Sequence, residues 1–179
     1  MSQDADKPIL FIDVDGVISL FGFGQGGEPP GRFHSIDGIH HWISATAGER
    51  LRRLGQRYEL VWATGWEEKA NEYLPFLLEL EGPEMHSLTF DGRIAAGAAH
   101  WKIEALEEYA GDRPAAWIDD NLDERAERWA EERPAPTLLV PTESAVGLDE
   151  EHVERLLEWA DEVRGPGDDP DGLEVMNAR

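Results

Sequence analysis

Five short apolar runs alternate along the chain with segments of helical spacing, and this alternation constrains the fold more than any other feature. Each run is rich in β-branched or aromatic residues and is bounded by polar, Gly or Pro residues, as expected of a buried strand. The runs are 8–14, 58–63, 85–90, 114–118 and 137–140. Strands that alternate with helices predict an α/β fold with a mostly parallel sheet. In such a sheet, ligands bind at the carboxyl ends of the strands.

The segments between and after these runs carry apolar residues at helical spacing. They are 46–56, 66–81, 99–109, 122–132 and 149–163. Pro75 lies inside the second segment, and because proline lacks a backbone donor it predicts a kink or a break near Leu74. The length of 179 residues suits one domain, which we expect over residues 1–164. The Gly-, Pro- and Asp-rich residues 165–179 predict a disordered tail.

An insertion between the first two runs contains a hairpin signal. Residues 20–31 have the composition of a loop, and two alternating runs then flank Asp37 and Gly38. Because Asp-Gly accepts the positive φ angles of a type I′ turn, this pattern predicts a β-hairpin.

Composition limits the partners of the chain. There are 38 acidic residues against 16 basic ones, a formal net charge of −22. Polyanion binding needs clustered Lys and Arg, so we expect no extended nucleic-acid surface and no membrane binding. The sequence has no Cys, which excludes disulfides and thiolate chemistry, and no apolar run long enough to span a bilayer. The polar, acidic start lacks the basic n-region of a signal peptide, so we expect a cytoplasmic protein.

Polar side chains follow three of the predicted strands. The residues at these strand ends are Asp13, Asp15, Thr64, Asp119 and Asp120. If the strands lie side by side, these residues form a compact acidic pocket. Carboxylates packed closely repel one another unless a cation neutralises them. Oxygen ligands without Cys favour Mg²⁺ over zinc.

Each feature alone has a simpler explanation. An isolated Asp-x-Asp-Gly is often a turn or an incidental cation site. Thr64, or the acidic pair at 119–120, could cap the helix that follows it. Lys102, one of only three lysines, could be a solvated helix residue, but near the pocket it would bind a phosphate oxygen. The joint pattern, in one order at strand ends and a helix start, favours catalysis.

These residues resemble the four motifs of the haloacid dehalogenase (HAD) superfamily. The sequence DVDGV at 13–17 is similar to the first motif, Thr64 to the second, Lys102 to the third and 119–120 to the fourth. More narrowly, DVDGV and VWATGWEEKAN at 61–71 resemble the HAD domain of bacterial RNA-repair ("Swiss Army knife") proteins. The resemblance implies a HAD-type, Rossmann-like three-layer fold around a five-stranded sheet.

The resemblance also implies a Mg²⁺-dependent phosphohydrolase, a phosphomonoesterase that acts through an aspartyl-phosphate. Asp13 would be the nucleophile, and Asp15 would be the general acid and then the base for the hydrolytic water. Mg²⁺ would be held by Asp13 and by the backbone carbonyl of Asp15. Asp119, with or without Asp120, would complete the metal site.

The same resemblance assigns the phosphoryl-binding groups. Thr64 would hydrogen-bond a phosphoryl oxygen, and Gly65 would leave its backbone N–H accessible. Lys102 would pair with the phosphoryl group and keep Asp13 ionised. HAD proteins carry a flap or a cap after the first motif, and here that insertion, 19–44, is short. We therefore expect a small β-hairpin flap without a large cap, and an open site that admits bulky substrates.

Three histidines and several aromatic residues lie near this predicted site. The histidines of the hairpin are His34, His40 and His41. Hairpin histidines are more often packing residues than acid–base groups, and adjacent residues of a strand face opposite sides. The aromatic residues that could form a wall at the mouth, or pack in the core, are Phe33, Trp42, Trp66 and Trp101.

Two classes of substrate fit this interpretation: a small phosphate ester, and a terminal phosphate of a nucleotide or nucleic acid. Two alternative functions are a signalling receiver domain and a non-catalytic binding module. A signalling receiver domain would carry its acidic pair first and a lone phosphorylated Asp later, whereas here the Asp-x-Asp comes first. A non-catalytic binding module would not need every motif residue, and all of them are present.

Overall fold

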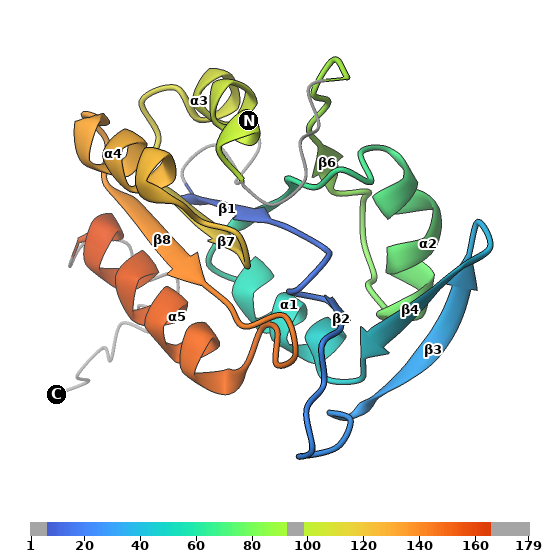
Figure 1. Cartoon of the computed structure of the whole chain (residues 1–179). Helices are drawn as coiled ribbons and strands as arrows, with labels where there is room; N and C mark the ends of the chain where they lie inside the picture. Colours follow the sequence, from blue (N-terminus) through green and yellow to red (C-terminus); the bar gives the residue numbers. More distant parts are fainter. Residues whose placement is uncertain (1–6, 93–98, 166–179) are drawn as a thin grey trace, which may run out of the picture.

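The computed structural model describes residues 7–92 and 99–165, and at its centre lies a five-stranded sheet (Figure 1). The strands are β1 (Ile9–Ile12), β5 (Glu59–Trp62), β6 (His86–Ser87), β7 (Ala115–Asp119) and β8 (Thr137–Pro141). Their order is β6-β5-β1-β7-β8, and each neighbouring pair is parallel. Each of the five apolar runs overlaps one of these strands, and β7 and β8 extend one residue beyond their runs, so the predicted α/β fold is confirmed.

Helices cover both faces of this sheet (Figure 1). The helices of the described residues are α1 (Ala47–Gly55), α2 (Lys69–Leu77), the 3₁₀ helix η2 (His100–Lys102), α3 (Ile103–Ala110), α4 (Glu124–Glu132) and α5 (Glu150–Arg164). Side chains of α1, α2 and α5 pack in the core on one face, and those of α3 and α4 in the core on the other. The result is a three-layer α/β architecture with β1 in the middle of the sheet.

The central strand β1 supplies side chains to both cores. Leu10 and Ile12 point into the core under α1, α2 and α5, while Ile9 and Phe11 point into the opposite one. All four side chains are fully buried. A strand buried on both faces has no polar positions to alternate, which is why this run is continuously apolar.

A second, antiparallel sheet lies beside α2 and forms the flap, residues 19–44 (Figure 1). It contains β2 (Ser19–Leu20), β3 (Gly31–Ile36) and β4 (Ile39–Ser44), in the order β2-β4-β3. The predicted hairpin is confirmed, because Asp37 and Gly38 have φ angles of 52° and 80° at its turn. The third strand, β2, was not predicted, since two residues carry no periodicity.

The tip of the flap is tied to α2. The carboxylate of Asp37 accepts hydrogen bonds from the ammonium of Lys69 and, at 2.9 Å, from the hydroxyl of Tyr73. Hydrogen bonds from these two groups, and the charge of Lys69, lower the pKa of Asp37. These contacts join the tip of the flap to α2.

One helix is shorter than predicted and is not broken at Pro75. The predicted helix at 66–81 begins only at Lys69, and Pro75 lies inside it without ending it at Leu74. The backbone N–H of Leu78 still donates to the carbonyl of Leu74 at 2.9 Å. Pro75 removes only its own donor, and the buried Ala70 and Leu74 hold the helix against the sheet.

The disordered tail predicted at 165–179 lies outside the described residues, apart from Gly165. Among the described helices, none combines the length and the apolar character that crossing a membrane would require.

Candidate active site

The register of the central sheet brings the first and fourth motifs together. In the β1–β7 pair, Ile12 lies opposite Ile118, and the backbone N–H of Asp13 donates to the carbonyl of Ile118 at 3.1 Å. Asp13 and Asp119 therefore leave adjacent parallel strands at the same level. Their side chains are buried, with residue exposures of 7% and 1%. The rule that ligand groups gather at strand carboxyl ends places both as expected.

Lys102 lies between these two carboxylates. Its Nζ is 3.0 Å from Oδ1 of Asp13 and 2.6 Å from Oδ2 of Asp119, and the residue is only 2% exposed. Burial by itself would lower the pKa of Lys102, but the two carboxylates outweigh it and the pKa is raised. The ammonium is therefore charged, and Lys102 is not the solvated helix residue of the simpler explanation.

The surroundings of Asp13 disfavour the ionised form of its carboxyl group. Burial raises the pKa of Asp13 to about 7, Lys102 opposes that shift, and the charge of Asp119 adds to it. At neutral pH the Asp13 carboxyl of the protein alone is then partly protonated. A further cation would favour the ionised form that a nucleophile needs.

The third carboxylate, Asp120, is held by groups that sequence reasoning missed. Its Oδ2 accepts from the hydroxyl of Ser144 and its Oδ1 from the side-chain amide of Asn121, both at 2.6 Å. The hydroxyl of Thr142 donates to the carbonyl of Gly16 at 2.9 Å. Thr142 and Ser144 follow β8, so the strand-end rule, applied to the fifth run, could have found them.

Gly16 is required by its conformation and by its neighbour. Its φ angle is +76°, a region that side chains disfavour, and an added Cβ would lie 2.1 Å from Oδ2 of Asp120. The glycine therefore lets the first-motif turn approach the acidic pair.

The carboxylates of Asp13, Asp119 and Asp120 form the one group of possible metal ligands found among the described residues. One oxygen from each lies within 4.8 Å of the others. Carboxylate oxygens are the ligands that Mg²⁺ prefers, so this donor set fits the expected ion. The carboxylate of Asp15 lies outside the group, and its metal contact through the backbone carbonyl stays a prediction.

Asp15 faces a different environment, on the side of the flap. Its Oδ2 accepts a hydrogen bond from the indole N–H of Trp66 at 2.9 Å, and its side chain is half-exposed. Nδ1 of His41 lies 3.8 Å from Oδ1 of Asp15 and 3.0 Å from the hydroxyl of Ser19. The His41 and Trp66 rings meet edge to face, with centroids 4.6 Å apart. Asp15 is thus positioned separately from the buried carboxylates and open to solvent.

Two of these contacts go beyond the predictions from sequence. Trp66 was expected only as an aromatic wall residue, and His41 as a packing residue. His40 instead packs edge to face on Phe33, so the two adjacent histidines have different surroundings. Contacts of this kind depend on how the flap lies over the sheet, which residue spacing does not specify.

Thr64 follows β5, the strand that pairs with β1 of the first motif. The N–H of Ala63 donates to the carbonyl of Ile12 at 2.8 Å, and Thr64 is 1% exposed. Its Oγ1 accepts from the N–H of Trp66 at 3.3 Å, which leaves the hydroxyl hydrogen for another acceptor. α2 begins only at Lys69, so Thr64 is not its cap. Gly65 is exposed beside it.

The remaining aromatic candidates divide between the mouth and the core. Phe33 and Trp42 line a hollow that also contains Asp15. Trp101 packs against Phe90, and its ring lies 5.3 Å from Nζ of Lys102. Trp101 therefore shields the buried ammonium from one side.

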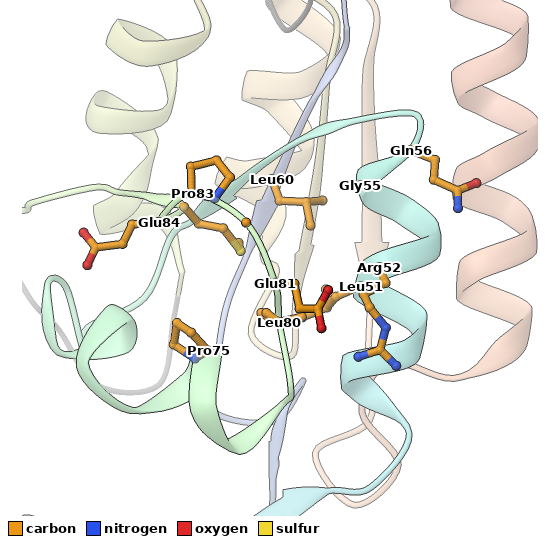
Figure 2. Close-up of a pocket in the computed structure, with 12 residues that line it drawn as sticks. Leu51, Arg52, Gly55, Gln56, Leu60, Pro75, Leu80, Glu81, Pro83 and Glu84 are labelled. Atoms are coloured by element: carbon orange, nitrogen blue, oxygen red, sulfur yellow. The ribbon is translucent and has the colours of Figure 1, made fainter.

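A hollow of about 340 Å³ elsewhere on the molecule shares no residue with this site. Figure 2 shows it between α1 and the chain that follows α2, lined by apolar side chains such as Leu51, Leu60 and Pro75. Leu60 lies early in β5, away from its carboxyl end. The hollow therefore offers none of the acidic groups described above.

Comparison with known proteins agrees with this geometry. A family model described as "HAD domain in Swiss Army Knife RNA repair proteins" matches residues 9–153, most of the chain. The matched region includes every site residue described above. No protein among the curated ones matches the chain.

Proposed function

The chain belongs to the family of HAD domains found in Swiss Army Knife RNA repair proteins, and from this premise we propose that it is a Mg²⁺-dependent phosphomonoesterase. The observation that carries the proposal is the buried arrangement of Asp13, Lys102 and Asp119 at the carboxyl ends of β1 and β7. An ion pair with a purely structural role would require neither a third carboxylate beside Asp13 and Asp119 nor a solvent-exposed carboxylate two residues after Asp13. Both are present, as Asp120 and Asp15.

The first chemical step is transfer of the phosphoryl group to Asp13. A carboxylate oxygen of Asp13 attacks phosphorus, and the bond from phosphorus to the leaving oxygen breaks. Asp15, in its protonated form, gives its proton to that leaving oxygen. The alcohol departs and an aspartyl-phosphate remains.

The second step is hydrolysis of this intermediate. Asp15, now ionised, takes a proton from a water molecule whose oxygen attacks phosphorus. The bond between phosphorus and Asp13 breaks, and inorganic phosphate is released. Both carboxyl groups return to their starting states, and the half-exposed position of Asp15 gives water access to it.

In this proposal, three groups bind the phosphoryl oxygens. These are the hydroxyl of Thr64, the backbone N–H of Gly65 and the ammonium of Lys102. Because the transition state carries its charge mainly on the equatorial oxygens, such donors lower the barrier by electrostatics and positioning. Lys102 also favours the ionised form of Asp13, against the effect of burial.

The metal fits the same site. Asp13, Asp119 and Asp120 would hold Mg²⁺, with the backbone carbonyl of Asp15 as a further ligand. When bound, the ion neutralises charge on the phosphoryl oxygens and on the carboxylates around them.

Turnover of p-nitrophenyl phosphate tests the proposal. We expect activity that requires Mg²⁺ and that falls by roughly 10³-fold or more in Asp13→Asn. The matched control is Asp112→Asn, which removes an exposed carboxylate in the turn after α3 and should leave activity unchanged. If wild type is inert while Asp13→Asn binds phosphate analogues equally well, the chain is a binding module and not an enzyme.

A further inference from the structure

A hollow of about 370 Å³ opens beside Asp15, within the flap, between strands β3 and β4 and the segment that follows β2. Its walls are mainly aromatic, with Phe21, Phe23, Phe33 and Trp42 around one end. Asp15 is the one carboxylate among the described residues that line it. Neither the proposed chemistry nor the packing of the core uses this hollow.

The aromatic rings are held in place without being buried. The Phe33 and Trp42 rings meet edge to face with centroids 4.8 Å apart, and Phe23 meets Trp42 at 5.8 Å. The indole N–H of Trp42 donates to the carbonyl of Pro29 at 3.1 Å, which fixes the ring. Phe33 is nevertheless 59% exposed and Phe21 49%. Exposed aromatic faces on a rigid support are typical of a surface that binds a ligand.

The position of Asp15 indicates which part of a substrate lies there; this step rests on the proposed function. Asp15 gives its proton to the leaving oxygen, so the group bonded to that oxygen lies on the Asp15 side. The nucleophile and the phosphoryl-binding residues lie instead at the strand ends, around Lys102. The hollow is therefore on the leaving-group side of phosphorus.

We propose that this hollow binds the nucleoside of a terminal nucleotide, with its base against Phe33 and Trp42. Planar bases stack on exposed aromatic faces, because every base presents a π-face. The volume lies near the lower end of ligand pockets, which suits one nucleoside and not a longer strand. His40 and His41 at its rim offer ring nitrogens to the polar edge of a base. A single-nucleotide site is also compatible with the net charge of −22.

Binding to the full chain carrying Asp13→Asn, which holds substrate without turnover, tests the proposal by calorimetry in Mg²⁺. The probes are adenosine 5′-monophosphate, an RNA oligonucleotide with a terminal phosphate, and ribose 5-phosphate, which lacks the base. We expect at least one base-carrying probe to bind about tenfold or more tighter than ribose 5-phosphate. Tighter binding of adenosine 5′-monophosphate would indicate a free nucleotide, and tighter binding of the oligonucleotide would indicate an RNA end. If neither binds more tightly than ribose 5-phosphate, the proposal is wrong.

A second substitution in that background locates the site. Phe33→Ala should weaken binding of the base-carrying probe about tenfold and leave ribose 5-phosphate unchanged, while Phe33→Tyr should retain binding. The control Ile39→Ala removes an equally exposed side chain of the same hairpin, outside the hollow, and should change neither. Equal effects of Phe33→Ala on both probes, or none, would overturn the proposal. Because no turnover is measured, a failed phosphatase assay leaves this result intact.

Discussion

At the scale of single residues, the site combines a buried charge cluster with one carboxylate that is open to solvent. Lys102 supplies one positive charge to three carboxylates, and the raised pKa values of Asp13 and Asp120, both caused first by burial, reflect that imbalance. Asp15 lies outside the cluster and accepts a hydrogen bond from Trp66. The proposed nucleophile, Asp13, and the proposed proton shuttle, Asp15, thus differ in environment although they are two residues apart.

Trp66 should act as a positioning residue for Asp15. Trp66→Phe keeps most of the ring but removes the N–H that lies 2.9 Å from Oδ2 of Asp15. We expect kcat to fall about tenfold, as for loss of a hydrogen bond to a charged group, with KM little changed. The loss should be larger for an alkyl phosphate than for p-nitrophenyl phosphate, whose leaving group needs little protonation.

The control for this substitution is Trp159→Phe. Trp159 belongs to α5, stacks on Tyr58 and packs partly buried against the core, so its change should leave kcat unaltered. An equal loss for both leaving groups in Trp66→Phe would indicate a structural effect and not a role in proton transfer.

The ionisable residues that the structure brings together could be picked out from sequence, and the contacts that support them could not. Asp13, Lys102 and Asp119 stand out because ionisable side chains at strand ends and a helix start need a reason to be there. Trp66 and His41 look like ordinary packing residues in the sequence. Their contacts with Asp15 appear only once the flap lies against the sheet.

At the scale of elements, the contacts of Asp37 with Lys69 and Tyr73 join the flap to α2, and we expect them to limit local opening of the flap. Asp37→Asn keeps a side chain that tolerates the φ angle of 52° and removes the charge that pairs with Lys69. We expect faster amide hydrogen exchange across β3 and β4, with little change in global stability, because an exposed ion pair contributes little to folding.

An exposed ion pair elsewhere provides the matched control. Asp161→Asn breaks the pair between Asp161 and Arg57, which are 3.2 Å apart on the α5 side of the molecule. It should leave hydrogen exchange in the flap unchanged. Unaltered exchange in Asp37→Asn as well would mean that the flap is held by other contacts.

Elements with a strong local signal were predicted well, and weaker ones were not. The hairpin follows from Asp37 and Gly38, which alone specify the turn. β2 exists only because Ser19 and Leu20 pair with β4, a long-range contact that leaves no pattern in sequence. Pro75 was misjudged because packing of α2 against the sheet outweighed the loss of one hydrogen bond.

At the scale of the whole molecule, the buried cluster should make stability depend on pH. The pKa of Asp13 is about 7 in the fold against 3.8 for the free group. Between these values the native state binds more protons than the unfolded state, so the free energy of unfolding falls as pH rises. In EDTA, urea denaturation should show a fall on the order of 2 kcal/mol from pH 5 to pH 8 through this group.

Asp13→Asn isolates this contribution from the general repulsion of an acidic chain. The variant lacks the titrating group, so its stability should fall less over the same interval. Mg²⁺ should stabilise the wild type at pH 8, where the site is ionised, more than at pH 5. Identical pH dependence of the two proteins would contradict the buried charge cluster.

The sequence predicted the sheet type but not the order of its strands. Alternation of strands and helices favours parallel pairing, whatever the order. The order β6-β5-β1-β7-β8 depends on where each crossover packs, which involves both cores at once. It is this order that places β1 between β5 and β7, and so Asp13 between Thr64 and Asp119.

The central claim, covalent catalysis by Asp13, is tested most directly by trapping the intermediate. Asp15→Asn removes the base for hydrolysis, so with p-nitrophenyl phosphate and Mg²⁺ the phosphorylated enzyme should accumulate. Mass spectrometry after acid quench should then find one phosphoryl group on the peptide that contains Asp13, and none when Asp13→Asn is added. Turnover by the wild type without a phosphoryl group on that peptide of Asp15→Asn, or turnover that survives Asp13→Asn, would contradict the claim.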